Sequence, residues 1–248
     1  MTIRTVLAIG LVLLSAAARA EQREVTFTAA DGFTLQGTFH SAPKGGPGIL
    51  LLHQCNADRR SYNQLAIMLN NAGYNVLSFD FRGFGGSRGG QYTDFSRERQ
   101  AIVDKMPGDV DAALKFLSSQ NTVIARALGV VGGSCGVNQA IQASRRHPDV
   151  RTLVLLSGGT NADGEAHIKA SRQLPIFGVA SEEDGSAPAS IQKIVGLSAH
   201  PDSRAQMLKN AGHAAEMLAR QEDLGADIVI WFRANLPVAG YGLPPAMR

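Results

Sequence analysis

The pentapeptide at residues 132–136, Gly-Gly-Ser-Cys-Gly, is the stretch whose residue types and spacing fit a specific chemistry. An apolar run, 128–131, precedes it, and a segment of helix-forming composition, 139–146, follows. The G-x-S-x-G pattern between them is typical of a nucleophile elbow, a sharp strand-to-helix turn that presents a serine hydroxyl. Ser134 is therefore the candidate nucleophile, and the helix start at Cys135 directs N–H groups toward a developing oxyanion. An ordinary glycine-rich turn is the alternative.

A serine hydroxyl is a weak nucleophile at neutral pH and needs an adjacent base, usually a histidine that a carboxylate orients. His213 follows an Ala-Gly pair in a predicted loop between the last strand and the last helix. His147 and His200 precede prolines in polar surroundings, and His167 has no partner in view. His213 is therefore the candidate base, and a solvated surface histidine is the alternative.

The candidate carboxylate is Asp184, which lies after the predicted strand 175–180. Two glutamates precede it, so a solvated acidic loop is the alternative interpretation. Ser134, Asp184 and His213 follow one another in one of the chain orders in which such triads occur. The combination of elbow, acid, base and order predicts a Ser-Asp-His triad.

Hydrophobic periodicity predicts the elements that position these residues. Strands are expected at 24–28, 33–40, 49–52, 76–79, 128–131, 152–156, 175–180 and 205–208. Helices are expected at 62–69, from about 96, at 109–117, at 139–146 and in a last stretch to about 236, with a polar excursion at 161–172. The alternation predicts an α/β fold: a mostly parallel, twisted central sheet of about eight strands, helices on both faces and no large cap domain. Ligands of such sheets bind outside the carboxyl ends of the strands, where the candidate residues fall.

The first twenty residues predict a secretory signal peptide. Arg4 gives a positive start, 6–14 is apolar apart from a glycine, and Ala18-Arg19-Ala20 is a small-x-small cleavage site. The apolar run is too short for a stable membrane-spanning helix, so cleavage is expected rather than anchoring. The mature protein is expected to be exported, periplasmic or secreted, without membrane attachment.

Removing 20 of the 248 residues leaves 228, a size that suits a single domain at 21–248 with a Pro/Gly-rich tail at 237–248. The mature chain carries 22 basic and 21 acidic residues because Arg4 and Arg19 leave with the signal peptide. No dense Lys/Arg run is present, so a nucleic-acid partner is not expected. The Asp, Glu and His residues lack metal-ligand spacing, and we predict neither a metal nor a cofactor.

The chain resembles the α/β-hydrolases, and among them the small dienelactone hydrolase-like members. The resemblance covers nearly all of the mature chain and lies in the elbow, His53-Gln54, Asp80-x-Arg82-Gly83-x-Gly85-x-Ser87, 175–184 and Ala211-Gly212-His213. It implies that Ser134 is the nucleophile, His213 the general base and then acid, and Asp184 the orienting acid. It also implies an oxyanion hole formed by the N–H of Cys135 and that of Cys55, or alternatively Gln54.

Two residues depart from the family pattern. Dienelactone hydrolases proper use a cysteine nucleophile, and Cys135 adjoins Ser134, but aligning the elbow on Cys135 loses the closing glycine. Gln54 replaces a usual glycine and adds a side chain that is expected to narrow the site or contact substrate. Asp80 and Arg82 are expected to be structural, in an ion pair that braces the floor behind the site.

Cys55 and Cys135 are the only cysteines of a chain that is expected to be exported. In the α/β-hydrolase topology the strands that end near them are neighbours, so both cysteines fall in the loops of the oxyanion hole. We therefore hypothesise a disulfide between Cys55 and Cys135, since disulfides persist outside the cytosol. Two separate buried thiols are the alternative.

Together these features predict a serine hydrolase that cleaves an ester or related acyl bond of a small-molecule substrate. A peptidase of the same fold and a non-catalytic binding protein on the same scaffold are the alternatives. Asn56, Arg59 and Arg60 are either contacts for an anionic substrate or solvated residues at a helix start. No oligomeric state is predicted.

Overall fold

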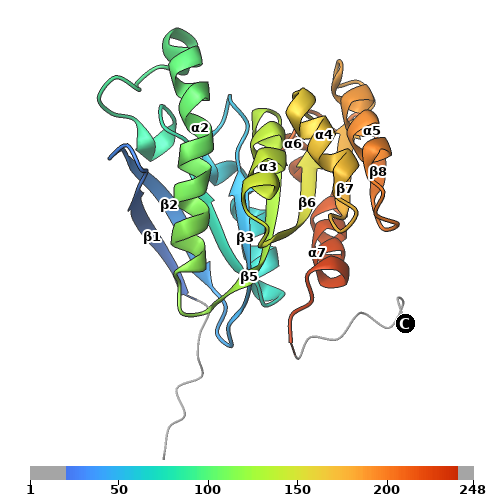
Figure 1. Cartoon of the computed structure of the whole chain (residues 1–248), viewed down its shortest axis with the longest axis horizontal. Helices are drawn as coiled ribbons and strands as arrows, with labels where there is room; N and C mark the ends of the chain where they lie inside the picture. Colours follow the sequence, from blue (N-terminus) through green and yellow to red (C-terminus); the bar gives the residue numbers. More distant parts are fainter. Residues whose placement is uncertain (1–20, 240–248) are drawn as a thin grey trace, which may run out of the picture.

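The computed structural model describes residues 21–239 and contains an eight-stranded sheet with helices on both faces (Figure 1). The strand order is β1-β2-β4-β3-β5-β6-β7-β8, antiparallel at β1–β2 and β2–β4 and parallel elsewhere. The predicted α/β fold with a mostly parallel sheet is confirmed. The predicted signal peptide, 1–20, and residues 240–248 of the tail lie outside the described residues.

The strands are β1 (Glu21–Thr28), β2 (Thr34–Ser41), β3 (Gly46–Leu52), β4 (Asn75–Phe79), β5 (Val123–Gly133), β6 (Val150–Leu156), β7 (Ile176–Ser181) and β8 (Arg204–Leu208). The helices are α1 (Asn63–Asn71), α2 (Phe95–Ser118), α3 (Cys135–Arg146), α4 (Ala162–Ala170), α5 (Ala187–Leu197), α6 (Glu216–Arg220) and α7 (Leu224–Asn235). Two short 3₁₀ turns, η1 (Arg59–Tyr62) and η2 (Gly85–Ser87), lie in the loops after β3 and β4. No helix among residues 21–239 is both long enough and apolar enough to cross a membrane.

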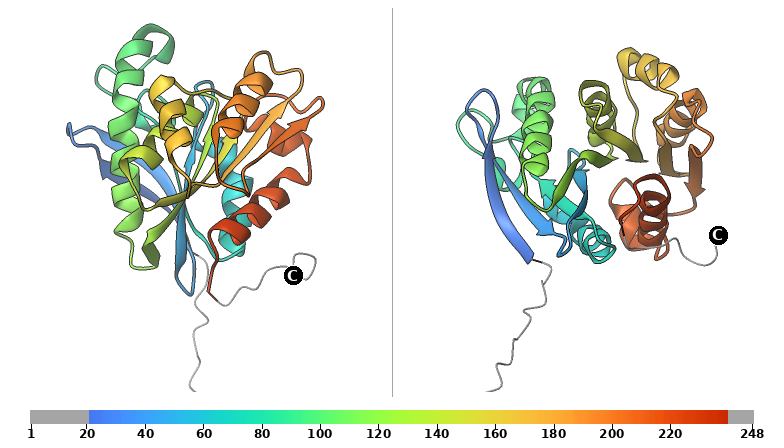
Figure 2. Two further views of the ribbon diagram at one scale, coloured as in Figure 1. Left: turned by 45° about the vertical axis from the view of Figure 1, so that its right-hand side comes forward. Right: turned by 60° about the horizontal axis from the view of Figure 1, so that its bottom comes forward.

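The sheet separates two apolar cores because successive side chains of a strand point to opposite faces. Along β3, Ile49 and Leu51 pack with α1, α6 and α7, whereas Leu50 and Leu52 pack with α2, α3, α4 and α5. Both layers are seen in Figure 2, with α2 to α5 over one face and α1 and α7 over the other. A strand buried on both faces needs an uninterrupted apolar run, which is why β3 was recognisable from its sequence.

The predicted helices near 96 and at 109–117 lie in one element, α2, which has a kink at Glu98 (φ −109°, ψ 17°) and continues through Pro107. Proline removes a helical hydrogen bond and costs about 3 kcal/mol inside a helix. The apolar face of α2 nevertheless continues across it, since Met106 and Val110 on either side are both buried. Packing against the sheet therefore outweighs the local preference to end the helix.

Three further helical segments differ from the sequence prediction. The polar excursion after β6 contains a helix, α4, whose Ile168 is buried. A helix that was not predicted, α5, follows β7 and covers the sheet with Ile191 and Ile194. The predicted last helix is divided into α6 and α7, because Gln221 has an extended backbone (φ −127°, ψ 97°) between them.

The connections leaving β3 and β5 run in opposite directions along the sheet. The chain passes from β3 to β4 on one side, and from β5 to β6 on the other, while β3 and β5 themselves are adjacent. Such a reversal opens a crevice at the carboxyl ends of the two strands, which is where ligands bind in open α/β sheets. Ser134 lies at the end of β5, directly at this reversal.

Candidate active site

Ser134 lies between β5 and α3 with a backbone conformation that L-residues rarely adopt (φ 53°, ψ −113°). Its N–H donates to the carbonyl of Leu156, at the end of β6, over 2.8 Å. A Cβ at position 132 would lie 2.3 Å from the carbonyl oxygen of Gly136, and one at 136 would lie 2.7 Å from that of Leu52. The two glycines of the motif are therefore required by close backbone contacts, as a nucleophile elbow needs.

Backbone strain gathers at this edge of the sheet. Four non-glycine residues of the described chain have positive φ angles, between 49° and 53°, and each follows the end of a strand: Ser134, Ser157, Asn210 and Ala214. Ser134 follows β5, Ser157 follows β6, and the other two flank the loop that follows β8. Such conformations cost about 1–3 kcal/mol each and cluster where a site over-determines its geometry. Their placement makes the carboxyl edge of the sheet the candidate functional edge.

His213 and Asp184 are brought together across the ends of β7 and β8. The Nδ1 of His213 lies 2.8 Å from Oδ2 of Asp184, and the two side chains are 34% and 18% exposed. The histidine loop also contacts the elbow, since a Cβ on Gly133 would lie 3.2 Å from that of Ala214. Gly133, directly before the serine, and Ala214, directly after the histidine, are thus packed together. The imidazole of His213 is partly exposed, and its Nδ1 is hydrogen-bonded to Asp184.

The glutamate before Asp184 has a different role. Glu183 Oε2 accepts hydrogen bonds from the N–H of Asn210 (2.9 Å) and from the hydroxyl of Ser181 (2.9 Å). The Asn210 bond is the largest of the interactions that hold the pKa of Glu183 below its ordinary value. Ser181 in turn accepts from the N–H of Ala211. These two residues brace the histidine loop, whereas Asp184 alone reaches the imidazole.

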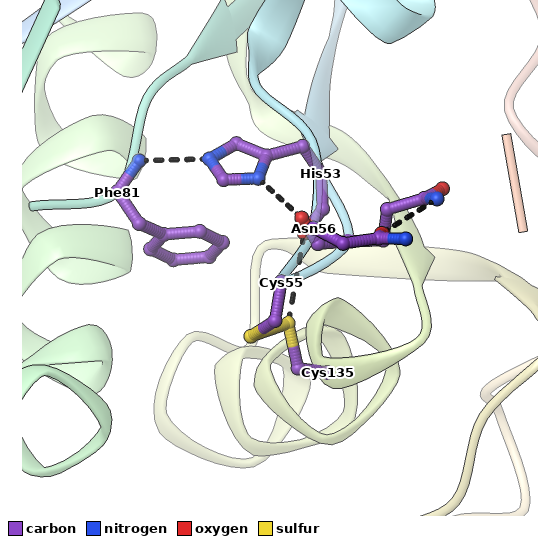
Figure 3. Close-up of a disulfide and its surroundings, with 6 residues drawn as sticks. His53, Cys55, Asn56, Phe81 and Cys135 are labelled. Carbon is purple, nitrogen blue, oxygen red and sulfur yellow. Dashed lines mark hydrogen bonds between the residues drawn. A yellow bond between two sulfur atoms is a disulfide. The ribbon is translucent and has the colours of Figure 1, made fainter. Parts of the chain in front are cut away.

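The predicted disulfide between Cys55 and Cys135 is present. It joins the loop after β3 to the first residue of α3, with the two Cα atoms 5.9 Å apart (Figure 3). Because the sulfur of Cys135 is bonded, it offers no thiolate, which weighs against Cys135 as the nucleophile. The N–H of Cys135 begins a helix and has no acceptor within it. Neither Gln54 nor Cys55 donates its backbone N–H to any acceptor among residues 21–239.

The side chain of Gln54 does not narrow the site in the way expected from the sequence. It is buried, its Oε1 accepts from the N–H of Ala215 over 2.8 Å, and its Nε2 donates to Asn56 over 2.9 Å. The amide therefore connects two loops of the site. This pairing could not be predicted from the sequence because the partner is a backbone group 161 positions away.

His53 is a fully buried structural histidine at the start of the loop after β3. The N–H of Phe81 donates to its Nε2 over 3.0 Å, so Nδ1 carries the hydrogen and donates to the carbonyl of Gln54 over 2.8 Å (Figure 3). Burial lowers the pKa of His53 from its ordinary value of 6.5 and outweighs the neighbouring carboxylates of Asp58 and Asp80. The neutral ring thus links the loop after β3 to the loop after β4.

Acidification should destabilise the protein through His53. The unfolded chain takes up this proton near pH 6.5, whereas the folded chain takes it up only at lower pH, so stability present above pH 6.5 is lost as the pH falls. The expected loss reaches about 1.4 kcal/mol per pH unit below that value. Urea unfolding at about pH 7.5 and 5.5 should give a steeper dependence of stability on pH for wild type than for His53→Gln, with His200→Gln, whose ring accepts from the exposed N–H of Asp202, as control. Equal slopes in wild type and His53→Gln would contradict this assignment.

Asp80 and Arg82 are structural, but they are not paired with each other. Arg82 forms its buried ion pair with Asp109 (2.6 Å) and a second with Asp31 (2.8 Å). Asp80 pairs with Arg59 and also accepts from the N–H of that residue at 2.8 Å. Three ion pairs in place of the one expected pair hold the loops behind the site.

Three residues after β3 were candidates to bind an anionic substrate, and two of them have carboxylate partners. Arg59 bonds Asp80 and Glu24, and Arg60 bonds Asp58. Asn56 is exposed and accepts from Gln54. The helix-start interpretation therefore describes Arg59 and Arg60 better than an anion site does.

An open groove of about 960 Å³ begins beside the disulfide. Its walls are residues 55–60 after β3, 83–86 and Arg88 after β4, and 93–96 at the start of α2. A smaller pocket of about 290 Å³ lies against His213 and Asp184, on their side toward α6. Among residues 21–239 no group of three or more His, Cys, Asp or Glu side chains is placed to hold a metal ion.

Comparison with known proteins places this geometry in a family. Residues 47–214 match the family described as serine aminopeptidase, S33. An uncharacterised protein of Mycobacterium tuberculosis is 27% identical over 214 residues, which is 77% of this chain and 72% of that protein. The folds of a Pyrococcus furiosus esterase (TM-score 0.73, 20% identity, 88% and 93% of the two chains) and an Anabaena variabilis dienelactone hydrolase (0.73, 17%, 88% and 99%) are similar. Since the matched segment spans well over half of the sequence, the chain belongs to the S33 family of α/β-hydrolases.

Proposed function

We propose that this protein is a serine hydrolase that cleaves a carboxylic ester or related acyl bond of a small molecule. The observation that carries the proposal is the His213–Asp184 hydrogen bond of 2.8 Å in a loop packed against the strained Ser134 elbow. Membership of a hydrolase family and the esterase-like folds of its structural neighbours support the same chemistry. The proposal assigns Ser134 as the nucleophile, His213 as the base and Asp184 as the orienting acid.

The reaction follows from the protonation states that these contacts favour. Asp184 accepts the hydrogen on Nδ1 of His213, which leaves Nε2 free to take the proton of the Ser134 hydroxyl. The serine oxygen bonds to the acyl carbon and the carbonyl electrons move to its oxygen. The tetrahedral intermediate then expels the alcohol, which takes the proton from His213. Water, activated by the same histidine, hydrolyses the acyl-enzyme.

The developing oxyanion requires donors that are already in position. The N–H of Cys135 is one candidate because it begins α3 and shares the positive end of that helix. The N–H of Cys55, or alternatively Gln54, is the second, and the disulfide joins the two loops that carry these donors. Removal of one such donor costs about 3 kcal/mol of transition-state stabilisation in other enzymes.

We assign the substrate to the groove beside the disulfide, because Cys55, which lines this groove, carries a proposed oxyanion donor. A peptidase activity is the second candidate, since the matching family carries an aminopeptidase description. We also propose that the protein is exported after cleavage of residues 1–20. The disulfide supports export, because such bonds persist in oxidising compartments.

A fluorophosphonate probe tests the proposal. Intact-mass analysis and peptide mapping should find one adduct per molecule of wild-type protein, on Ser134, and none on Ser134→Ala. Turnover of p-nitrophenyl esters beside aminoacyl p-nitroanilides then distinguishes an esterase from a peptidase. The intact mass of protein purified from cells also reports the N-terminus, which should be Glu21.

Two outcomes would contradict the proposal. An adduct on Cys135 would move the chemistry to a cysteine nucleophile. Folded wild-type protein with no adduct and no acyl turnover would favour a non-catalytic binding protein on the same scaffold. A mass that includes residues 1–20 would contradict export alone.

A further inference from the structure

We propose that Gln54 is a positioning residue that fixes the general base relative to the oxyanion hole. The inference deepens the proposed function and rests on it. The side chain of Gln54 is buried and bonds a backbone group 161 positions away in the chain.

The loop that carries His213 is held in part by Glu216, whose N–H donates to the carbonyl of His213 over 3.0 Å, and in part by side chains from outside the loop. Asn210 and Ala214 both have positive φ angles, at 52° and 49°, and only short helix α6 follows. Before the histidine, two N–H groups of the loop donate to the side chains of Glu183 and Ser181, which lie outside the loop. After the histidine, the acceptor is the amide oxygen of Gln54.

The Gln54 contact lies two residues beyond His213. Its Oε1 accepts from the N–H of Ala215 over 2.8 Å, and both groups are buried, so neither finds water as a substitute. Loss of this acceptor would leave a buried N–H unpaired at the point where the strained Ala214 joins the helix. The histidine loop is then free to move on that side, while Asp184 still holds Nδ1.

The same residue belongs to the loop that supplies the second oxyanion donor. Its backbone adjoins Cys55, which the disulfide ties to Cys135 beside the nucleophile. Its Nε2 donates to Asn56, which fixes the orientation of the amide. The disulfide connects the nucleophile to the oxyanion loop, and the Gln54 side chain connects that loop to the base loop. A displacement of about 1 Å between such groups can cost 100-fold in rate.

Gln54→Met tests the inference because it keeps the volume and removes the acceptor. We expect kcat to fall about 10- to 100-fold with little change in KM, and the rate of fluorophosphonate labelling of Ser134 to fall in parallel. Gln54→Glu retains an acceptor for Ala215 but brings a carboxylate close to the proposed oxyanion hole, so its expected effect is wild-type hydrogen exchange at 210–218 rather than wild-type kcat. Asn56→Ala, which removes only the partner of Nε2, is the matched control and should lose less than Gln54→Met. Hydrogen exchange of the peptide at 210–218 should accelerate in Gln54→Met.

Labelling and turnover of the wild-type protein test the proposed function first. The Gln54 variants then test this inference separately, so failure of one can be told from failure of the other. Folded Gln54→Met with wild-type kcat and unchanged exchange at 210–218 would overturn the inference. So would exchange at 210–218 that is as fast in Gln54→Glu as in Gln54→Met, because the acceptor would then not be what holds the loop. If Gln54→Met does not fold, wild-type exchange in Gln54→Glu beside faster exchange in a folded Gln54→Ala supports the role, and equally fast exchange in both contradicts it.

Discussion

Ser134→Ala should lower kcat by about 10⁶-fold, and Asp184→Asn by about 10⁴-fold, with both proteins still folded. The serine variant loses the atom that forms the acyl-enzyme. The aspartate variant keeps a hydrogen-bonding side chain at the same place, but the amide can hold His213 in the tautomer whose Nε2 is protonated. That ring cannot accept the serine proton, so the loss is one of chemistry rather than of folding.

The measurement is steady-state turnover of a p-nitrophenyl ester, with unfolding curves to establish that each variant is folded. Glu182→Gln is the matched control, since Glu182 is exposed two positions from Asp184 and should change kcat by less than about twofold. The double variant Ser134→Ala/Asp184→Asn should be little worse than Ser134→Ala, because the members of a triad act as one unit. Retained activity in Asp184→Asn, with loss in Glu183→Gln, would reassign the orienting acid to Glu183.

The positions where strands end and the order of the candidate catalytic residues could be predicted from the sequence because both depend on local patterns. A buried parallel strand such as β3 needs a continuous apolar run, and an elbow needs glycines at fixed offsets from Ser134. The placement of Asp184 after one strand and His213 after the next follows from the alternation of strands and helices. These features do not require knowledge of which distant residues meet.

The contacts that the sequence did not predict join residues far apart in the chain. Arg82 was expected to pair with its neighbour Asp80, yet it pairs with Asp109 on α2, whose register is set by packing across Pro107. The Gln54 amide meets a backbone group, and a backbone group leaves no residue-type signal. The one local hint was Gln54 itself, a long polar side chain at a position where the motif has glycine. Departures from a motif were thus informative, but their partners required the fold.

Loss of the Cys55–Cys135 disulfide should reduce both the stability and the turnover of the protein. The bond closes a separation of 80 residues, for which the chain-entropy model gives about 4.5 kcal/mol of stabilisation. It also crosses the reversal between β3 and β5, where one cysteine begins α3 beside Ser134 and the other lies in the opposing loop. The bond therefore fixes the distance between the two candidate oxyanion donors directly.

The double variant Cys55→Ala/Cys135→Ala separates these two effects. Its free energy of unfolding in urea should fall by about 4 kcal/mol, and its kcat, measured at a temperature where it is folded, should fall by about tenfold or more. Wild-type protein treated with a reductant that opens the bond should match the variant in both respects. A large loss of stability with unchanged kcat would show that the bond only supports the fold. In that case the loop that carries the second oxyanion donor keeps its geometry without the disulfide. The neutral His53 ring and the Gln54 amide would be the contacts that hold it.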